Sequence, residues 1–426
     1  MTTIIKQSQK LYREGFFHVM LGNTLVKAIA FISSIVIVRL VDKQSYAYLA
    51  YVNNLYAYIA LFSGFGMSSA LLKYCSSTAD ISSNKAFFYF AIKYGSIFQF
   101  VLTIVLLGYM YIAEIPFPEA RSLALLFILM PVLTYVLQTT QSYVRSQRNN
   151  KLYAQIGVTQ TIIVFIFSIL FVLTLGIKGV PMARYLGVTI GIIVAIRYVR
   201  NSFIGSITIT LSRSQIKSFI LMGKSLMIAN LFSMIMPLNE LFLINHLLRD
   251  EAITANYKIA MLIPSQLSFI TGSIMVYYFP IIAQMTKNKK ILKTSINVQL
   301  LAASIIGCIS LIGYIFTPYI IEFVYGDIYS DAMTLSRLFW LVYAINSGFR
   351  MIPMNIMPAI GRVKFNERMA IITSIVHLLV DYLLLSKFGI SGAIYATLSV
   401  YLISGTIYWY YLIKICHADA DANIVI

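Results

Sequence analysis

Long apolar segments recur from one end of the chain to the other. Each is close to the length of about 20 apolar residues that a helix needs to cross a bilayer. The segments are residues 16–41, 47–73, 86–112, 122–144, 153–175, 180–199, 219–245, 255–283, 294–321, 332–358, 366–386 and 390–414. Charged residues make up only 11% of the chain, whereas soluble proteins carry about 25%. The pattern predicts an all-α integral membrane protein with about 12 transmembrane helices, and it excludes an attached soluble catalytic domain.

The longest polar connector, residues 200–217, separates two sets of six segments. It predicts four parts, which are an N-terminal six-helix lobe (1–203), a cytoplasmic connector (204–217), a C-terminal six-helix lobe (218–414) and a cytoplasmic tail (415–426). A short motif recurs between the lobes, because GIKGV at 176–180 matches GISGA at 389–393, an offset of 213 residues. Both lobes begin on the same side and the motif precedes the last segment of each. We therefore predict a parallel pseudo-two-fold repeat, which is typical of alternating-access transporters.

The net charge of +18 resides mainly in the loops. Twenty Lys and Arg residues fall in the loops of one side and seven in those of the other, where Arg184 is among the seven. The positive-inside rule then places both termini in the cytoplasm. The charge thus indicates membrane orientation rather than a nucleic-acid partner. Cys75, Cys308 and Cys416 are far apart and predict neither a disulfide nor a metal site, and no cofactor is expected.

Ionisable residues within spanning segments are costly, so each is a candidate for a functional role. Lys27 shares a helical face with Asn23 in the middle of the first segment. A net basic interior suits an anionic substrate such as a pyrophosphate, for which Lys supplies a point charge. The alternative for Lys27 is an ion pair with an acid on another helix, for example Glu240.

Three further residues are predicted to contact substrate. Arg350 lies deep in its segment, and the alternative is a contact with a carbonyl group freed by Pro353 or Pro358. Lys258 lies near the end of its segment, where its side chain could instead extend to the membrane interface. Gln138 offers a neutral amide for sugar hydroxyl groups.

A second set of embedded groups is predicted to bind a coupling ion. Glu240 follows Pro237 on the seventh segment, and His377 and Asp381 are four residues apart on the eleventh. Their charge changes with protonation, so they can couple transport to a proton or sodium gradient. The alternatives are that Glu240 is a counter-charge for a Lys, and that His377 and Asp381 form hydrogen bonds between helices.

Several short motifs resemble those of one transporter family. They are SGFGMSSALLKY (63–74), YKIAMLIPSQL (257–267) with Phe279-Pro280, FVYGDIYSDAMTLSRL (323–338), Gly361-Arg362, and KFGISGAIYATLSVYL (387–402). In order and spacing they are similar to motifs of Wzx-type O-antigen flippases, which belong to the superfamily that also contains multidrug/toxin extruders and lipid II flippases. Ser63 departs from the family, which often has an acid there.

The resemblance implies movement of an undecaprenyl-pyrophosphate-linked oligosaccharide across a bacterial inner membrane, for lipopolysaccharide or capsule synthesis. It also implies membrane lipids and other polysaccharide-assembly membrane proteins as partners, and no enzymatic activity. Two alternatives remain open. One is a multidrug or organic-ion antiporter of the same superfamily, whose cationic substrates disagree with a basic interior. The other is a membrane O-antigen polymerase, although no outer loop is large enough to resemble one.

Overall fold

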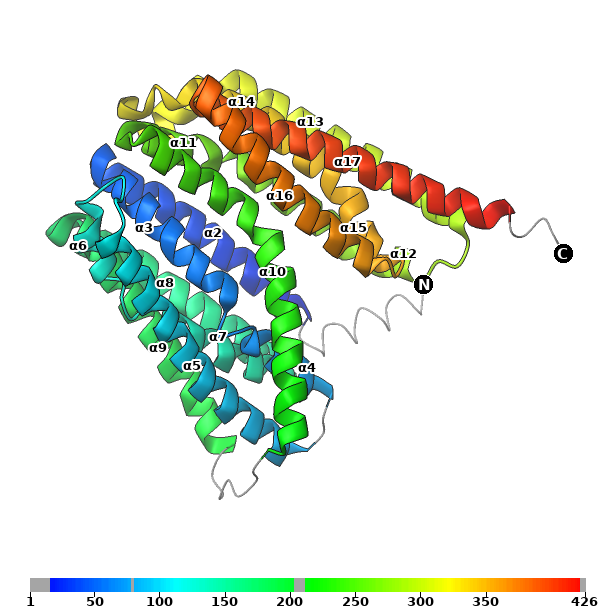
Figure 1. The fold of residues 1–426 in the computed structure, drawn as a ribbon, viewed down its shortest axis with the longest axis horizontal. Helices are drawn as coiled ribbons and strands as arrows, with labels where there is room; N and C mark the ends of the chain where they lie inside the picture. Colours follow the sequence, from blue (N-terminus) through cyan, green and yellow to red (C-terminus); the bar gives the residue numbers. More distant parts are fainter. Residues whose placement is uncertain (1–15, 78–79, 203–210, 422–426) are drawn as a thin grey trace. The chain divides into compact units, whose positions relative to one another are not determined.

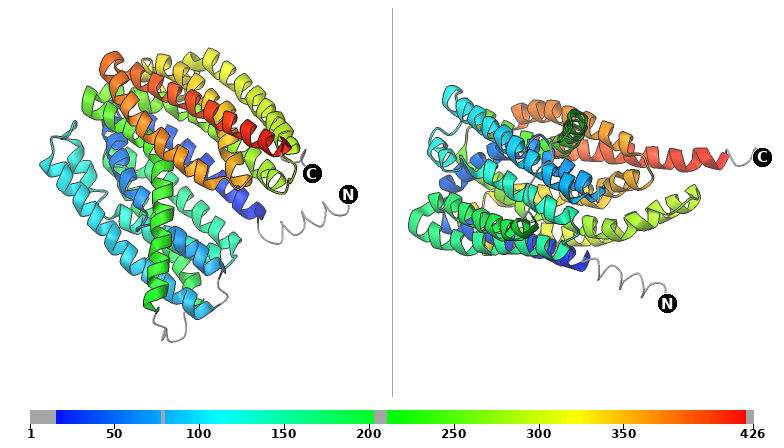
Figure 2. Two further views of the ribbon diagram at one scale, coloured as in Figure 1. Left: turned by 45° about the vertical axis from the view of Figure 1, so that its right-hand side comes forward. Right: turned by 90° about the horizontal axis from the view of Figure 1, so that it is seen from below.

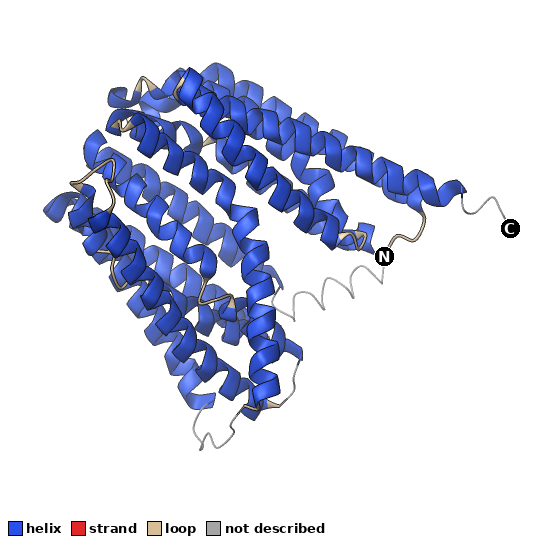
Figure 3. Cartoon of the chain, viewed as in Figure 1, coloured by secondary structure: helices blue, strands red, loops and turns tan. Residues whose placement is uncertain are grey.

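The computed structural model describes residues 16–77, 80–202 and 211–421, and within these ranges it contains helices and turns but no strand (Figure 3). The chain divides into two compact units, residues 1–231 and 232–426, with the division inside α10 (Arg213–Leu248). The predicted connector 204–217 lies partly outside the described residues, and its last five residues form the start of α10.

Unit 1 is a bundle of helices that begins at α2 (Figure 1). Its elements before α10 are α2 (Phe16–Leu40), α3 (Lys43–Phe62), α4 (Met67–Ser77), α5 (Ile81–Ile112), α6 (Ala120–Leu125), α7 (Met130–Ser146), α8 (Asn150–Leu175), the 3-10 turn η1 (Gly176–Lys178) and α9 (Gly179–Ser202). Helix α8 packs against both α2 and α9 (Figure 2). Buried apolar side chains of α4, α5, α7, α8, α9 and the first part of α10 form the core of this unit.

Unit 2 holds the second half of the chain. After α10 its elements are α11 (Glu251–Leu262), η2 (Pro264–Gln266), α12 (Leu267–Ala283), α13 (Asn288–Tyr325), η3 (Asp327–Tyr329), α14 (Ala332–Ile345), the π-helical turn η4 (Asn346–Arg350), α15 (Met351–Ala359), α16 (Val363–Phe388) and α17 (Ile390–Asp421). A separate core cluster joins α12, α13, α15 and α17. Helices α16 and α17 run side by side (Figure 1).

The helices present the apolar surface that a bilayer requires. Eight helical segments of the described chain are long and apolar enough to cross a membrane, or ten if two bent pairs each count as one span. This criterion takes Asn150–Val199 as one segment, although Gly176 separates α8 from α9. Large apolar side chains such as Ile112 and Phe323 are 90% and 83% exposed, which in water would be an aggregation surface but in lipid is favourable. The all-α membrane fold is confirmed, whereas the number of about 12 spans and the cytoplasmic termini stay predictions.

The internal repeat is visible in the backbone. Helices α8 and α16 both contain 26 residues, and they begin 213 residues apart. Each ends at a glycine of the repeated motif with the same positive φ, with φ 60° and ψ −145° at Gly176 and φ 61° and ψ −147° at Gly389. Only glycine adopts such angles without strain. The predicted repeat therefore corresponds to two copies of one helix–turn–helix arrangement.

The second glycine of each motif lets the following helix approach closely. A side chain at Gly392 would collide with the carbonyl oxygen of Leu384, and one at Gly179 would collide with that of Phe171, its equivalent in unit 1. We expect Gly392→Ala to destabilise the protein by about 1–3 kcal/mol, the usual cost of overpacking. The melting temperature in detergent should fall by several degrees. Gly272→Ala is the matched control, because nothing lies within 4 Å of that position, and an unchanged melting temperature for Gly392→Ala would contradict the close approach.

The predicted continuous segment 47–73 is broken in the structure. Helix α3 ends at Phe62 and α4 begins at Met67, and the four residues between them, Ser63 to Gly66, all have positive φ. Glycine tolerates this conformation, whereas Ser63 and Phe65 are strained in it. The buried amide of Gln99 on α5 holds the break, because its Oε1 accepts from the Gly64 N–H (3.0 Å) and its Nε2 donates to the Ile59 carbonyl (3.1 Å).

Candidate functional sites in the two units

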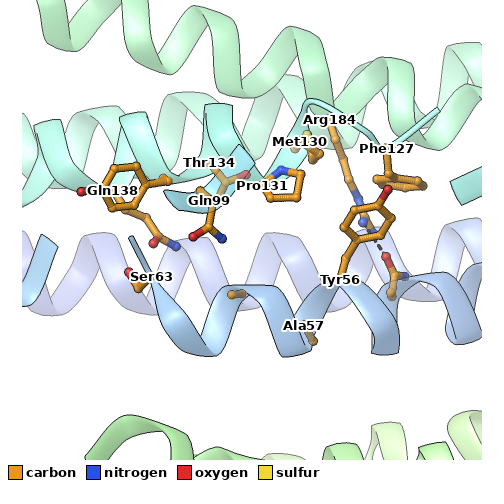
Figure 4. Close-up of a pocket in the computed structure, with 13 residues that line it drawn as sticks. Tyr56, Ala57, Ser63, Gln99, Phe127, Met130, Pro131, Thr134, Gln138 and Arg184 are labelled. Carbon is orange, nitrogen blue, oxygen red and sulfur yellow. Dashed lines mark hydrogen bonds between the residues drawn. The ribbon is translucent and has the colours of Figure 1, made fainter. Parts of the chain in front are cut away.

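A cavity lined by both polar and apolar side chains lies inside unit 1, beside the break between α3 and α4. Its volume is about 190 Å³, which is room for several water molecules or a phosphate-sized group. The lining residues are Asn53, Tyr56, Ala57, Ala60, Ser63, Gln99, Phe127, Met130, Pro131, Thr134, Tyr135, Gln138 and Arg184. Figure 4 shows Arg184, Tyr56 and Phe127 together at one end, and Ser63, Gln99 and Gln138 toward the other. The predicted residue Gln138 thus lines a cavity, and its exposed amide faces it.

Arg184 is the cation of this cavity, although its place in the sequence suggested a loop residue. It extends from the first turns of α9, and its Nη1 donates to the Asn53 Oδ1 on α3 (2.7 Å). Its guanidinium carbon lies 5.3 Å from the ring centroid of Phe127. Among the described residues no acid pairs with it. A sequence signal for this role existed, because Arg184 lies inside the apolar segment 180–199 rather than before it.

A second cavity of about 300 Å³ meets the first at Arg184, Met130 and Thr134. It lies between α2, α7, α8 and α9 and is lined by Ser33, Ser34 and Gln160 among others. Arg184 therefore stands at the junction of two cavities.

The two predicted residues of the first helix lie outside these two cavities. Lys27 and Asn23 are exposed on α2 and line neither of them, whereas Ser34, further along the same helix, lines the larger one.

An acidic pair lies inside unit 2. The side chains of Glu240 on α10 and Asp381 on α16 are 4% and 0% exposed and interact electrostatically with each other. Oε1 of Glu240 and both carboxyl oxygens of Asp381 have no hydrogen-bond partner among the described residues. Two buried carboxyl groups with unused acceptor atoms repel each other unless a proton or a cation lies between them. The structure therefore brings together two of the three residues predicted for a coupling ion.

The surroundings of the pair supply hydroxyl groups and one cation. Glu240 lies near the hydroxyl groups of Tyr257 and Thr397 and near the ammonium group of Lys258 on α11. Lys258, predicted as a substrate contact, is thus part of the acidic cluster. Sequence reasoning missed Tyr257 and Thr397, because neither type of residue is unusual in a membrane helix.

His377 joins this cluster through α17. Its Nε2 lies 2.8 Å from the hydroxyl oxygen of Thr397, and its Nδ1 has no hydrogen-bond partner among the described residues. The histidine thus forms the interhelical hydrogen bond that was the alternative prediction, with Thr397 on α17 as its partner. Within the described chain no group of three or more His, Cys, Asp or Glu residues is arranged to hold a metal ion.

Arg350 is held by neutral side chains at the π-helical turn between α14 and α15. Its Nε donates to the Ser404 Oγ (2.9 Å) and its Nη1 to the Asn346 Oδ1 (3.0 Å), and its guanidinium carbon lies 4.8 Å from the ring centroid of Tyr401. Arg350 therefore contacts side chains, and not the carbonyl group freed by Pro353 or Pro358 that was the alternative prediction. A π-turn widens a helix locally and often marks a functional site; here it presents Arg350 to α17.

A comparison with protein families decides which family the protein belongs to. The model of a family described as polysaccharide biosynthesis protein matches residues 12–286, more than half of the chain. The chain belongs to the polysaccharide biosynthesis protein family. A search of curated proteins found no match to this chain.

Several solved structures share the fold of this polysaccharide biosynthesis protein. An inward-facing multidrug resistance MATE family transporter of the MOP superfamily has a TM-score of 0.72 over 92% of this chain and 95% of its own, at 15% identity. Lipid II flippase MurJ, in an inward closed conformation, has a TM-score of 0.72 over 93% of this chain and 87% of its own, also at 15% identity. A MOP superfamily transporter from Pyrococcus furiosus has a TM-score of 0.62 over 94% of each chain, at 14% identity. At these identities the matches establish the fold and nothing finer.

Proposed function

We propose that the protein is a flippase. It moves an undecaprenyl-pyrophosphate-linked oligosaccharide, such as an O-antigen or capsule repeat unit, from the inner to the outer leaflet of a bacterial inner membrane. Membership in the polysaccharide biosynthesis protein family carries this proposal, and the fold shared with a lipid II flippase supports it. The oligosaccharide crosses the membrane by alternating access, without a chemical reaction.

The proposed substrate contacts divide by chemistry. Lys27 in unit 1 and Arg350 in unit 2 are each proposed as a contact for phosphate oxygens, because Lys offers a point charge and Arg a two-pronged hydrogen-bond fork. Asn23 and Gln138 contact sugar hydroxyl groups through their amides. Lys258, beside Glu240 in unit 2, links substrate binding to the acidic pair.

The acidic pair is the proposed site of coupling. A proton or a sodium ion binds at Glu240 and Asp381, and His377 adjusts the position of α16 relative to α17 through Thr397. Buried ionisable groups in a membrane are costly, so such a cluster indicates a role in ion movement.

A multidrug antiporter is the second candidate function. The MATE family structure matches as well as MurJ does, and the acids of unit 2 would suit an organic cation. The cavity of unit 1 favours the flippase instead, because its charged residue is an arginine with no acidic partner among the described residues.

The test is an assay in the cells that carry this gene. Depletion of the protein should cause lipid-linked oligosaccharide to accumulate on the inner leaflet, where a lectin added to spheroplasts cannot reach it. Re-expression should restore lectin access. If depletion leaves lectin access unchanged but raises sensitivity to organic cations, the antiporter function is correct and the flippase proposal fails.

The orientation is tested by reporter fusions. Fusions after Lys151, Lys217 and Lys290 should report the cytoplasm, since these loops carry the excess of Lys and Arg. Fusions near Glu119 and Asp327 should report the outside. An external reporter after Lys217 would reverse the proposed orientation.

A further inference from the structure

The guanidinium group of Arg184 has more hydrogen-bond donors than the structure uses. A guanidinium carries five N–H donors, and the one hydrogen bond it makes within the described chain is to Asn53. The acids of unit 1 that the structure describes are Asp42, Asp80, Glu114 and Glu119, which lie at helix caps or in loops. A cation inside a membrane protein without a counter-ion is costly unless a ligand supplies one.

The cavity that Arg184 lines has two chemically different ends. At one end the guanidinium lies beside the aromatic rings of Tyr56 and Phe127 (Figure 4). At the other end lie the amides of Gln99 and Gln138. Gln99 is occupied by the backbone at the α3–α4 break, whereas the structure gives Gln138 and Thr134 no hydrogen-bond partner within the described residues. One end therefore suits a negative charge, and the other suits hydroxyl groups.

The internal repeat shows that unit 1 has a cation at this position and that unit 2 does not. The 213-residue offset of the repeated motif pairs Arg184 with Thr397. In unit 2 that position holds a hydroxyl group bound to His377 and close to Glu240. The same place in the repeated fold is thus basic in unit 1 and lies within an acidic cluster in unit 2.

The geometry points to an oxyanion-binding site at Arg184 within unit 1. The site takes a phosphate or carboxylate group of the transported molecule through the guanidinium, with attached hydroxyl groups placed toward Gln138. The inference rests on the proposed function and adds a binding residue and a substrate chemistry to it. The cavity volume of about 190 Å³ admits one such charged group and not a whole oligosaccharide.

The test measures binding of two simple probes to the purified full-length protein in neutral-lipid nanodiscs by isothermal titration calorimetry. Sodium pyrophosphate represents the lipid carrier and glucuronate represents an acidic sugar, with glucose as the uncharged control. We expect the wild type to bind at least one anionic probe at least ten times more tightly than glucose. Tighter binding of pyrophosphate would assign the site to the carrier, and tighter binding of glucuronate would assign it to an acidic sugar.

Three variants decide whether Arg184 is responsible. Arg184→Gln should weaken binding of the preferred probe at least tenfold, and Arg184→Lys should weaken it less. Asn53→Asp keeps the arginine and places a carboxylate within hydrogen-bond distance of it, so this variant should fold and should also lose the anion. Arg121→Gln is the matched control, because Arg121 donates to the Met110 carbonyl outside the cavity, and it should bind as the wild type does.

Two results would overturn the site. One is the absence of anion binding by folded wild-type protein, and the other is equal affinity in the wild type and in Asn53→Asp. An equal loss in Arg121→Gln would also overturn it, since net charge would then explain the effect. The proposed function is judged separately by lectin access in cells. Normal flipping without anion binding rejects only the Arg184 site, and anion binding without flipping rejects only the proposed function.

Discussion

Glu240→Gln is expected to abolish most of the ion-driven component of transport. The substitution keeps the shape of the side chain but removes the charge that, together with Asp381, would hold a proton or sodium ion inside unit 2. Coupling free energies between two sites are typically about 1–3 kcal/mol, so the stimulation of transport by an imposed gradient should fall about 5- to 150-fold. Reconstituted vesicles with and without a proton or sodium gradient provide the measurement.

The two carboxyl groups should behave as one unit in this assay. The structure places both acids together, and their carboxyl groups carry oxygens without a hydrogen-bond partner among the described residues. Asp381→Asn should therefore cause a similar loss, and the double variant should lose little more than either single variant, since residues that act together are not additive. Glu322→Gln is the matched control, because Glu322 is exposed at the end of α13. Gradient responses that are equal in wild type and Glu240→Gln would make this acid a counter-charge for Lys258.

Lys27→Ala should lose most of the flipping activity at an unchanged protein level in the membrane. A charge-assisted contact with a phosphate contributes about 1.5–3 kcal/mol, which corresponds to a loss of roughly 10- to 150-fold. Lys27→Arg should retain part of the activity, since the positive charge stays. Lectin access in spheroplasts, normalised to the amount of protein in the membrane, measures the effect.

The control for Lys27 is a lysine with the same change of charge and no proposed role. Lys178 is exposed in the turn η1 before α9, so Lys178→Ala should flip normally. Should Lys27→Ala also flip normally, the residue has no part in binding. Should it disappear from the membrane, its role is structural, and the exposed face of α2 is then an assembly surface rather than a binding surface.

The membrane class and the helical segments followed from the sequence, because hydropathy reports directly on transfer into lipid and needs no tertiary information. The repeat followed as well, since the motif at 176–180 and 389–393 places one glycine where φ is positive and a second where the next helix packs closely. The breaks within segments did not follow. At 63–66 a left-handed turn is stabilised by Gln99 from another helix, and no local pattern contains that partner.

The sequence by itself identified Glu240, Arg350, His377 and Asp381 as candidates, because each is an ionisable residue in an apolar segment. Only the tertiary structure decided which of them act together. It placed Glu240 beside Asp381, which lies 141 residues further along the chain, and it joined His377 on α16 to Thr397 on α17. It also showed that Arg184, which the sequence suggested as a loop residue, lines a cavity of unit 1. The physical reason is that the role of a buried charged group depends on the side chains that surround it. In a helical bundle those side chains come from other helices.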